Sequence, residues 1–265
     1  MRPAPVPLRY SLRLLRPLVL LPLAALLAGC GATTMPAIHS EPERLAQGRR
    51  ALENRDYNIA IELLKSYVAN NAGGADVDQA VELLGESYLR IKEWGEAQIQ
   101  FERLLRDYPE SDSAGSASFH LGETLWGQAR GPDFDQEYTR KALEQWQSYL
   151  RGFPGHWRNA QGEQRVQRAR ERLAKNFADG GILYVKLRRS GPARAYFRRV
   201  LDQYADTAAA AQAALGLALA DALDGRRAEA MAALRDVESR YRGRPEARRA
   251  AKELARLERQ ERKKK

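Results

Sequence analysis

The side chains of this 265-residue chain that could take part in chemistry are few and scattered. The three histidines, His39, His120 and His156, lie too far apart for the i,i+4 pair with which a helix binds a metal ion. Serines at 111, 113, 116 and 118 surround an expected helix start, where serine is a natural cap. The segment 115–122 lacks the lysine of a phosphate-binding loop. We therefore predict a protein that is not an enzyme and has no metal or cofactor site.

The single cysteine has a chemistry of its own. Cys30 closes the sequence Leu27-Ala28-Gly29-Cys30, after a basic start and an apolar stretch of about 11 residues. That stretch is too short to cross a bilayer, which takes roughly 20 residues, and it is typical of a secretory signal. The ending matches the bacterial lipoprotein signal, in which the cysteine is acylated. We expect residues 1–29 to be a signal peptide and Cys30 to carry the lipid, including palmitate. Gly31, where an aspartate would indicate the inner membrane, favours the outer membrane.

The net charge of +10 is unevenly distributed. Without the four arginines of the signal it falls to +6, and Arg242–Lys265 alone carries 11 basic and 4 acidic residues, a net +7. The body of the protein is therefore close to neutral, and we predict no nucleic-acid partner. Residues 30–42 contain Pro36 and Pro42 and predict a tether of ~40 Å when extended.

The rest of the chain repeats a spacing of small residues. Gly48 and Ala60, Gly85 and Ala97, and Gly181 and Ala193 are each twelve positions apart. A bulky residue follows one turn later, as Phe101 follows Ala97, and lies on the same helical face. This is the signature of the tetratricopeptide repeat, a helical hairpin of about 34 residues.

Two further repeats depart from this spacing. Gly122 and Ala142 are 20 positions apart, which predicts an inserted loop at Gly131-Pro132-Asp133. A weaker repeat contains Ala218 and Ala230. The expected repeats lie near residues 43–76, 77–111, 114–155, 158–206 and 208–242, within a domain of residues 43–265.

No strand pattern of period two interrupts these repeats. We predict an all-α fold, an α-solenoid of about five tetratricopeptide hairpins in which each repeat buries its apolar face against the next. The final basic helix, 245–265, has Ala247, Ala250, Leu254 and Leu257 on one face and is expected to cap the stack.

In such a solenoid the first helices of the hairpins line a groove. We therefore predict that the protein works by binding other proteins in this groove. Phe119 and Trp126 are the proposed anchors, since aromatic residues dominate binding energy at interfaces; the alternative is that they pack under the inserted loop 127–139. The predicted groove residues are Leu45, Arg49, Leu52, Gln79, Glu82, Glu86, Leu89, Phe119, Glu123 and Trp126.

The mature chain resembles the BamD family of outer-membrane assembly lipoproteins. The resemblance is carried by Thr139-Arg140-Lys141-Ala142-Leu143, by Tyr149-Leu150-Arg151-Gly152-Phe153-Pro154, by Arg172-Leu173-Ala174-Lys175 and by Tyr204-Ala205-Asp206-Thr207. It implies a scaffold on the periplasmic face of the outer membrane, within the machinery that assembles β-barrel proteins. It also implies that later repeats dock onto the periplasmic domains of a BamA-like barrel subunit and that earlier repeats receive unfolded outer-membrane protein segments.

Two other functions remain open. The chain would also suit a tetratricopeptide lipoprotein adaptor for cell-wall hydrolases or envelope constriction. The basic tail 242–265 would alternatively bind acidic lipid headgroups or anionic wall polymers, or serve only as a solvated capping helix.

Overall fold

The computed structural model describes residues 40–263, so the predicted signal peptide, Cys30 and most of the tether lie outside the described residues. Within 40–263 every regular element is an α-helix, as predicted. The helices are α2 (Glu41–Glu53), α3 (Tyr57–Asn70), α4 (Val77–Arg90), α5 (Trp94–Asp107), α6 (Ala114–Gln128), α7 (Glu137–Gly152), α8 (Asn159–Lys186), α9 (Ser190–Gln203), α10 (Ala209–Leu223), α11 (Arg227–Arg240) and α12 (Pro245–Arg262). None of them is long and apolar enough to cross a membrane.

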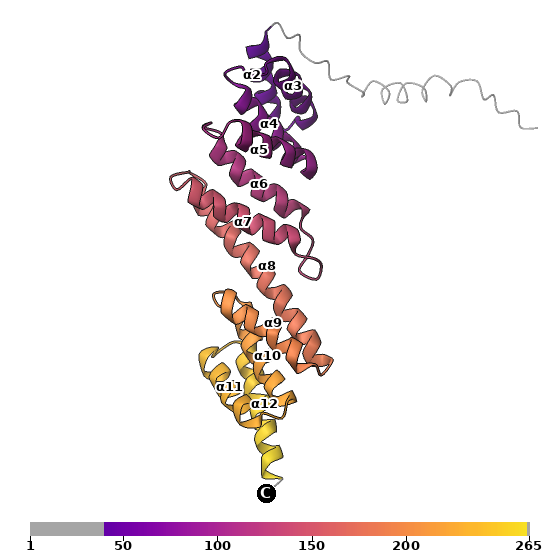
Figure 1. Ribbon diagram of the computed structural model, residues 1–265, viewed down its shortest axis with the longest axis vertical. Coiled ribbons are helices and arrows are strands. Elements are labelled where there is room, and N and C mark those ends of the chain that lie inside the picture. Colours follow the sequence, from indigo (N-terminus) through magenta and orange to yellow (C-terminus); the bar gives the residue numbers. More distant parts are fainter. Residues whose placement is uncertain (1–39, 264–265) are drawn as a thin grey trace, which may run out of the picture. The chain divides into compact units, whose positions relative to one another are not determined.

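The helices form five consecutive hairpins, each packed on the next (Figure 1). The hairpins pair α2 with α3, α4 with α5, α6 with α7, α8 with α9 and α10 with α11. The first helices also contact one another along much of the stack, as α2 contacts α4 and α8 contacts α10. Helix α8 has 28 residues, about twice the length of most other helices, and packs against both α7 and α10. The predicted α-solenoid is confirmed.

The turns inside four of the hairpins share one backbone geometry. Arg55, Lys92, Arg188 and Gly225 each follow the first helix with a positive φ, between 55° and 77°. The amide of Lys92 donates to the carbonyl of Leu89, and the next amide donates back to Tyr88. This 6→1 and 5→2 pattern is the Schellman motif, which ends a helix and reverses the chain. Three of the four positions use a residue with a Cβ, for which this conformation is unfavourable.

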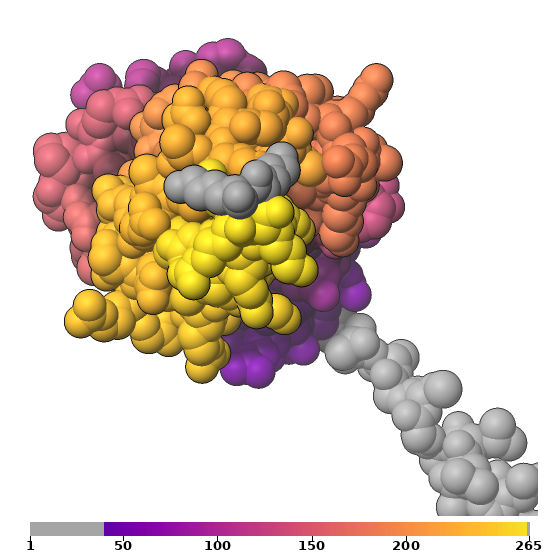
Figure 2. Space-filling model, turned by 90° about the horizontal axis from the view of Figure 1, so that it is seen from below, coloured from indigo at the N-terminus to yellow at the C-terminus, as the bar shows by residue number. Residues whose placement is uncertain are grey.

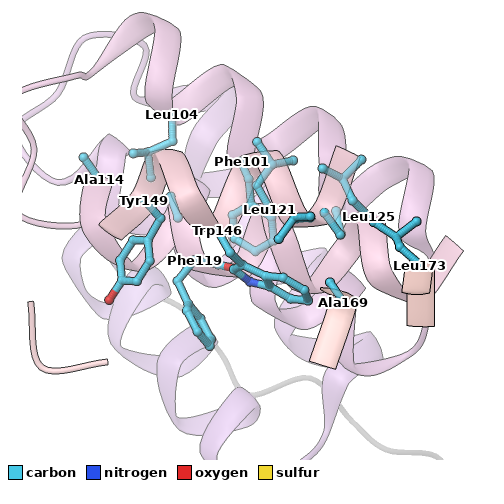
Figure 3. Close-up of a cluster of buried hydrophobic side chains, with 14 of the residues drawn as sticks. Phe101, Leu104, Ala114, Phe119, Leu121, Leu125, Trp146, Tyr149, Ala169 and Leu173 are labelled. Atoms are coloured by element: carbon cyan, nitrogen blue, oxygen red, sulfur yellow. The ribbon is translucent and has the colours of Figure 1, made fainter. Parts of the chain in front are cut away.

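Small residues let the paired helices approach closely. A Cβ added at Gly122 would lie 2.3 Å from the indole Nε1 of Trp146, and one added at Gly85 would lie 2.7 Å from the Phe101 ring. Ala97 and Ala142, at the equivalent place on the second helices, are fully buried. The small and large residues that alternate in the sequence are therefore the residues in contact between paired helices. Figure 3 shows the buried apolar side chains that surround Trp146.

The C-terminal helix closes the stack, as predicted. Ala247, Ala250, Leu254 and Leu257 are all less than 9% exposed, and the last three join a separate apolar cluster with α10 and α11. Figure 2 shows this end of the molecule, with α12 lying alongside the hairpin that precedes it. The outward side of α12 is strongly basic.

Candidate functional site

The histidines of the described part do not assemble a reactive site. His120 is buried on α6 between the rings of Phe101 and Phe119, with centroids 5.6 and 5.7 Å away. Burial lowers the pKa of His120 to about 4, so its imidazole is neutral near pH 7. His156, between α7 and α8, places its Nδ1 2.7 Å from the hydroxyl of Tyr149. Within 40–263, no three His, Cys, Asp or Glu side chains gather as metal ligands would.

A first cleft of about 500 Å³ opens over α2 and α4. Five of the predicted groove residues line it together: Arg49, Leu52, Gln79, Glu82 and Glu86. Their positions follow from helical periodicity, because residues three or four apart share one face of α4. Sequence reasoning missed five other residues of the same lining, Glu53, Arg55, Tyr57, Leu83 and Arg90. Arg55 and Tyr57 belong to the turn and the second helix of the first hairpin, whereas the predicted groove was built from first helices alone.

The polar groups of the first cleft are partly engaged with one another. Arg49 donates a hydrogen bond to the side-chain oxygen of Gln79, and Arg90 forms an ion pair with Glu86 one turn away. Glu82 accepts a hydrogen bond of 2.8 Å from the hydroxyl of Ser113. Burial raises the pKa of Glu82, and the bond from Ser113 opposes that shift. Glu82 is thus a desolvated acceptor that further donors would stabilise.

Two predicted groove residues are largely buried. Leu45 is 7% exposed and belongs to the main apolar cluster of the stack, although it also contributes to the wall of an adjacent cleft with Arg49 and Gln79. Phe119 is 2% exposed, so the prediction that it is an exposed anchor is wrong. Its ring lies edge-on to Tyr149, with centroids 5.5 Å apart, and the guanidinium of Arg158 covers it at 5.2 Å. The α7–α8 connection supplies Arg158, so this connection helps to cover Phe119. Leu89 is partly buried against the core and does not line the first cleft.

The remaining two groove residues contact the long helix α8. Glu123 forms an ion pair with Arg165 across 42 residues of sequence. Trp126 is half-buried, and the guanidinium carbon of Arg172 lies 3.4 Å from its ring centroid, which is a cation–π contact. Trp126 also approaches Trp146, with centroids 5.9 Å apart. Trp126 is therefore partly covered by α8 and only partly exposed.

Trp126 lines a second cleft, of about 540 Å³, between α6, α8 and α10. Arg168, Arg172 and Lys175 from α8 contribute to its wall, and Glu171 and Glu246 line the same cleft. Lys175 is paired with Asp179, whereas Arg168 and Arg172 have no carboxylate of the described chain within ion-pair distance. Burial, reinforced by Arg168, lowers the pKa of Arg172. The inserted loop closes one side, since Asn176 donates to the carbonyl of Pro132 at 2.6 Å.

The basic wall of the second cleft was missed by sequence reasoning. Its signal was present, since Arg165, Arg168 and Arg172 recur at intervals of three and four and therefore share one face of α8. Both clefts are lined chiefly by first helices of the hairpins. They provide apolar, acidic and basic groups that suit binding to another protein chain better than bond-making chemistry.

The chain is similar to a known protein family and to several solved structures. The family YfiO, described as an outer membrane lipoprotein, matches residues 39–233. No curated protein matches the chain.

Several solved structures are similar at low sequence identity. The TPR2AB domain of yeast Sti1, in a complex with pHSP90, is 14% identical over 82% of this chain and 86% of its own, with a TM-score of 0.45. A thermophilic TPR protein from Thermus thermophilus is 19% identical over 82% of this chain and all of its own, with a TM-score of 0.38. PilW, a type IV pilus biogenesis factor, is 18% identical over 84% and 93%, with a TM-score of 0.36.

Proposed function

The chain belongs to the YfiO family of outer membrane lipoproteins, and from that premise we propose that it is a lipid-anchored scaffold whose groove holds extended segments of unfolded outer-membrane proteins. In this proposal Cys30 carries the anchor and the protein faces the periplasm. The later repeats dock onto the periplasmic domains of a BamA-like barrel subunit within the β-barrel assembly machinery.

One observation carries the proposal: five residues chosen from the sequence for their place on the first helices line a single cleft. Extended segments of barrel proteins alternate apolar and polar side chains. They also expose backbone donors and acceptors that need partners once removed from water. Leu52 offers an apolar contact, whereas Gln79, Glu82 and Arg49 offer hydrogen bonds in the same channel. A cleft with this mixture suits many related segments better than one rigid ligand.

The second cleft would extend the groove toward the later repeats. Trp126 lines this cleft beside two guanidinium groups that lack carboxylate partners among the described residues. Both clefts are open and modest in volume, so we expect weak binding of a single segment, about micromolar, which corresponds to about −8 kcal/mol.

Site-specific photo-crosslinking tests the proposal. A photoreactive amino acid at Gln79, in the first cleft, is compared with one at Glu62, on the exposed side of α3. Crosslinked partners from intact cells are identified by mass spectrometry. Unfolded barrel segments captured at Gln79 but not at Glu62 are the expected result. Cell-wall hydrolases captured at Gln79 would instead favour the adaptor function, and equal capture at both positions would refute a groove-specific role.

Peptide affinity provides a second measurement. Leu52→Ala and Trp126→Ala are expected to weaken binding of a barrel-strand peptide in fluorescence anisotropy. Each hot-spot truncation should cost about 2 kcal/mol. Phe119→Ala belongs to the core and should lower the melting temperature instead. Unchanged affinity in both groove variants would place the peptide site elsewhere.

A further inference from the structure

A third cleft, near the C-terminal end of the stack, gathers four arginines from distant parts of the chain. Arg188 follows α8, Arg227 begins α11, and Arg249 and Arg256 belong to α12. The cleft has a volume of about 340 Å³, and we call it the arginine cleft. It is distinct from the two clefts described above, which share none of its lining residues.

The charge of the arginine cleft is not balanced by the described residues. Its one acidic residue, Glu253, is paired with Arg256 at 2.7 Å. Arg188, Arg227 and Arg249 have no carboxylate of residues 40–263 within ion-pair distance. Bringing like charges together is unfavourable unless water or an anion compensates. With four arginines and one glutamate, the lining carries three positive charges in excess, which favours an anionic ligand.

Apart from Gln260, the remaining lining is apolar. Leu219 and Leu223 of α10 and Leu257 of α12 contribute to it, together with Val185. At the same end of α8, Leu183 and Leu187 are 54% and 58% exposed. A small inorganic anion would make no use of these apolar side chains. A ligand with a charged group joined to an apolar body would use both parts of the cleft.

We propose that the arginine cleft binds the headgroup phosphate of an anionic phospholipid, with the glycerol and the start of the acyl chains against the leucines. Guanidinium groups match phosphate oxygens with paired hydrogen bonds. Basic pockets that bind lipid headgroups are known among membrane proteins. The volume suits one headgroup, whereas a protein partner ordinarily covers about 800 Å² of surface. Because the chain belongs to an outer membrane lipoprotein family, a bilayer is the source of such a lipid. The inference does not depend on which protein segments bind in the first two clefts.

The test uses the full chain in an uncharged detergent and short-chain dihexanoyl phosphatidylglycerol, followed by calorimetry. Dihexanoyl phosphatidylcholine, inorganic phosphate and polyglutamate are compared as competing probes. The variant Arg188→Gln/Arg227→Gln/Arg249→Gln should bind phosphatidylglycerol on the order of 100-fold more weakly, from ~1 kcal/mol per arginine. The control Arg151→Gln/Arg198→Gln/Arg242→Gln removes the same charge from exposed arginines elsewhere and should bind as the wild type does.

Two further variants keep the test decisive. Arg249→Gln alone changes one exposed side chain without an ion pair in the described chain and should lower affinity severalfold even if the triple variant misfolds. Leu223→Ser should weaken lipid binding while leaving any phosphate binding unchanged. Equal weakening in the charge-matched control would overturn the proposal, as would phosphate or polyglutamate binding as tightly as the lipid, or phosphatidylcholine binding equally well.

Discussion

The closest helix–helix approach inside the third hairpin gives the sharpest test of the packing argument. In Gly122→Ala the new methyl group would lie 2.3 Å from Nε1 of Trp146 and 2.5 Å from its Cδ1. Trp146 is fully buried and donates a hydrogen bond of 3.2 Å to the carbonyl of Phe119. The indole cannot move into solvent, so either the helices separate or the hydrogen bond is lost.

The expected change in the free energy of unfolding of Gly122→Ala is the sum of opposing effects. Overpacking a core costs about 1–3 kcal/mol, and loss of the indole hydrogen bond adds about 1 kcal/mol. The greater helix propensity of alanine returns at most ~1 kcal/mol. We expect a net destabilisation of about 2 kcal/mol. For a domain of this size that lowers the melting temperature by about 4–8 °C.

A second glycine-to-alanine substitution separates the effect of overpacking from the effect of helix propensity. Gly95 lies in the first turn of α5, and a Cβ added there meets no side chain or backbone outside its neighbours within 4 Å. Gly95→Ala should therefore leave the melting temperature unchanged or raise it slightly. Thermal unfolding followed by circular dichroism measures both variants. A melting temperature for Gly122→Ala equal to that of Gly95→Ala would refute the assigned contact between α6 and α7.

Three other predictions test separate features. Cys30→Ala should yield an unprocessed or soluble periplasmic protein, measured by membrane fractionation after a high-salt wash, and persistence in the outer membrane would contradict the anchor. Lys92→Gly should stabilise the protein by about 0.5–1 kcal/mol, because glycine adopts the positive φ of 65° without strain, whereas Gly225→Lys should destabilise it in the same urea titration. His120 has a folded-state pKa of about 4, below its unfolded value near 6.5, so its stabilisation is present above pH 6.5 and is lost as pH falls toward 4. The loss should reach roughly 3 kcal/mol, and His120→Leu should remove that part of the pH dependence in equilibrium unfolding; an unaltered profile would show that other groups control acid stability.

Much of the fold could be predicted because a solenoid is encoded locally. Gly85, Ala97 and Phe101 lie within 16 residues of one another. The sizes of their side chains indicate which two helices approach closely and which side chain fills the space between them. The same reasoning identified the capping stripe of α12, since its apolar residues recur with the helical period. Five groove residues followed for the same reason, because each could be placed on a helix face.

The tertiary structure decided which of those faces remain open. Phe119 and Trp126 are seven residues apart on α6 and look equivalent in the sequence. Phe119 is nevertheless buried beneath Arg158, whereas Trp126, beside Arg172, remains half-buried. The arginine cleft likewise joins residues from α8, α11 and α12. Helical periodicity specifies contacts between neighbouring turns and neighbouring helices. Contacts between residues 39 or more positions apart depend on how α8 and the connections around it pack, and local sequence patterns do not specify that packing.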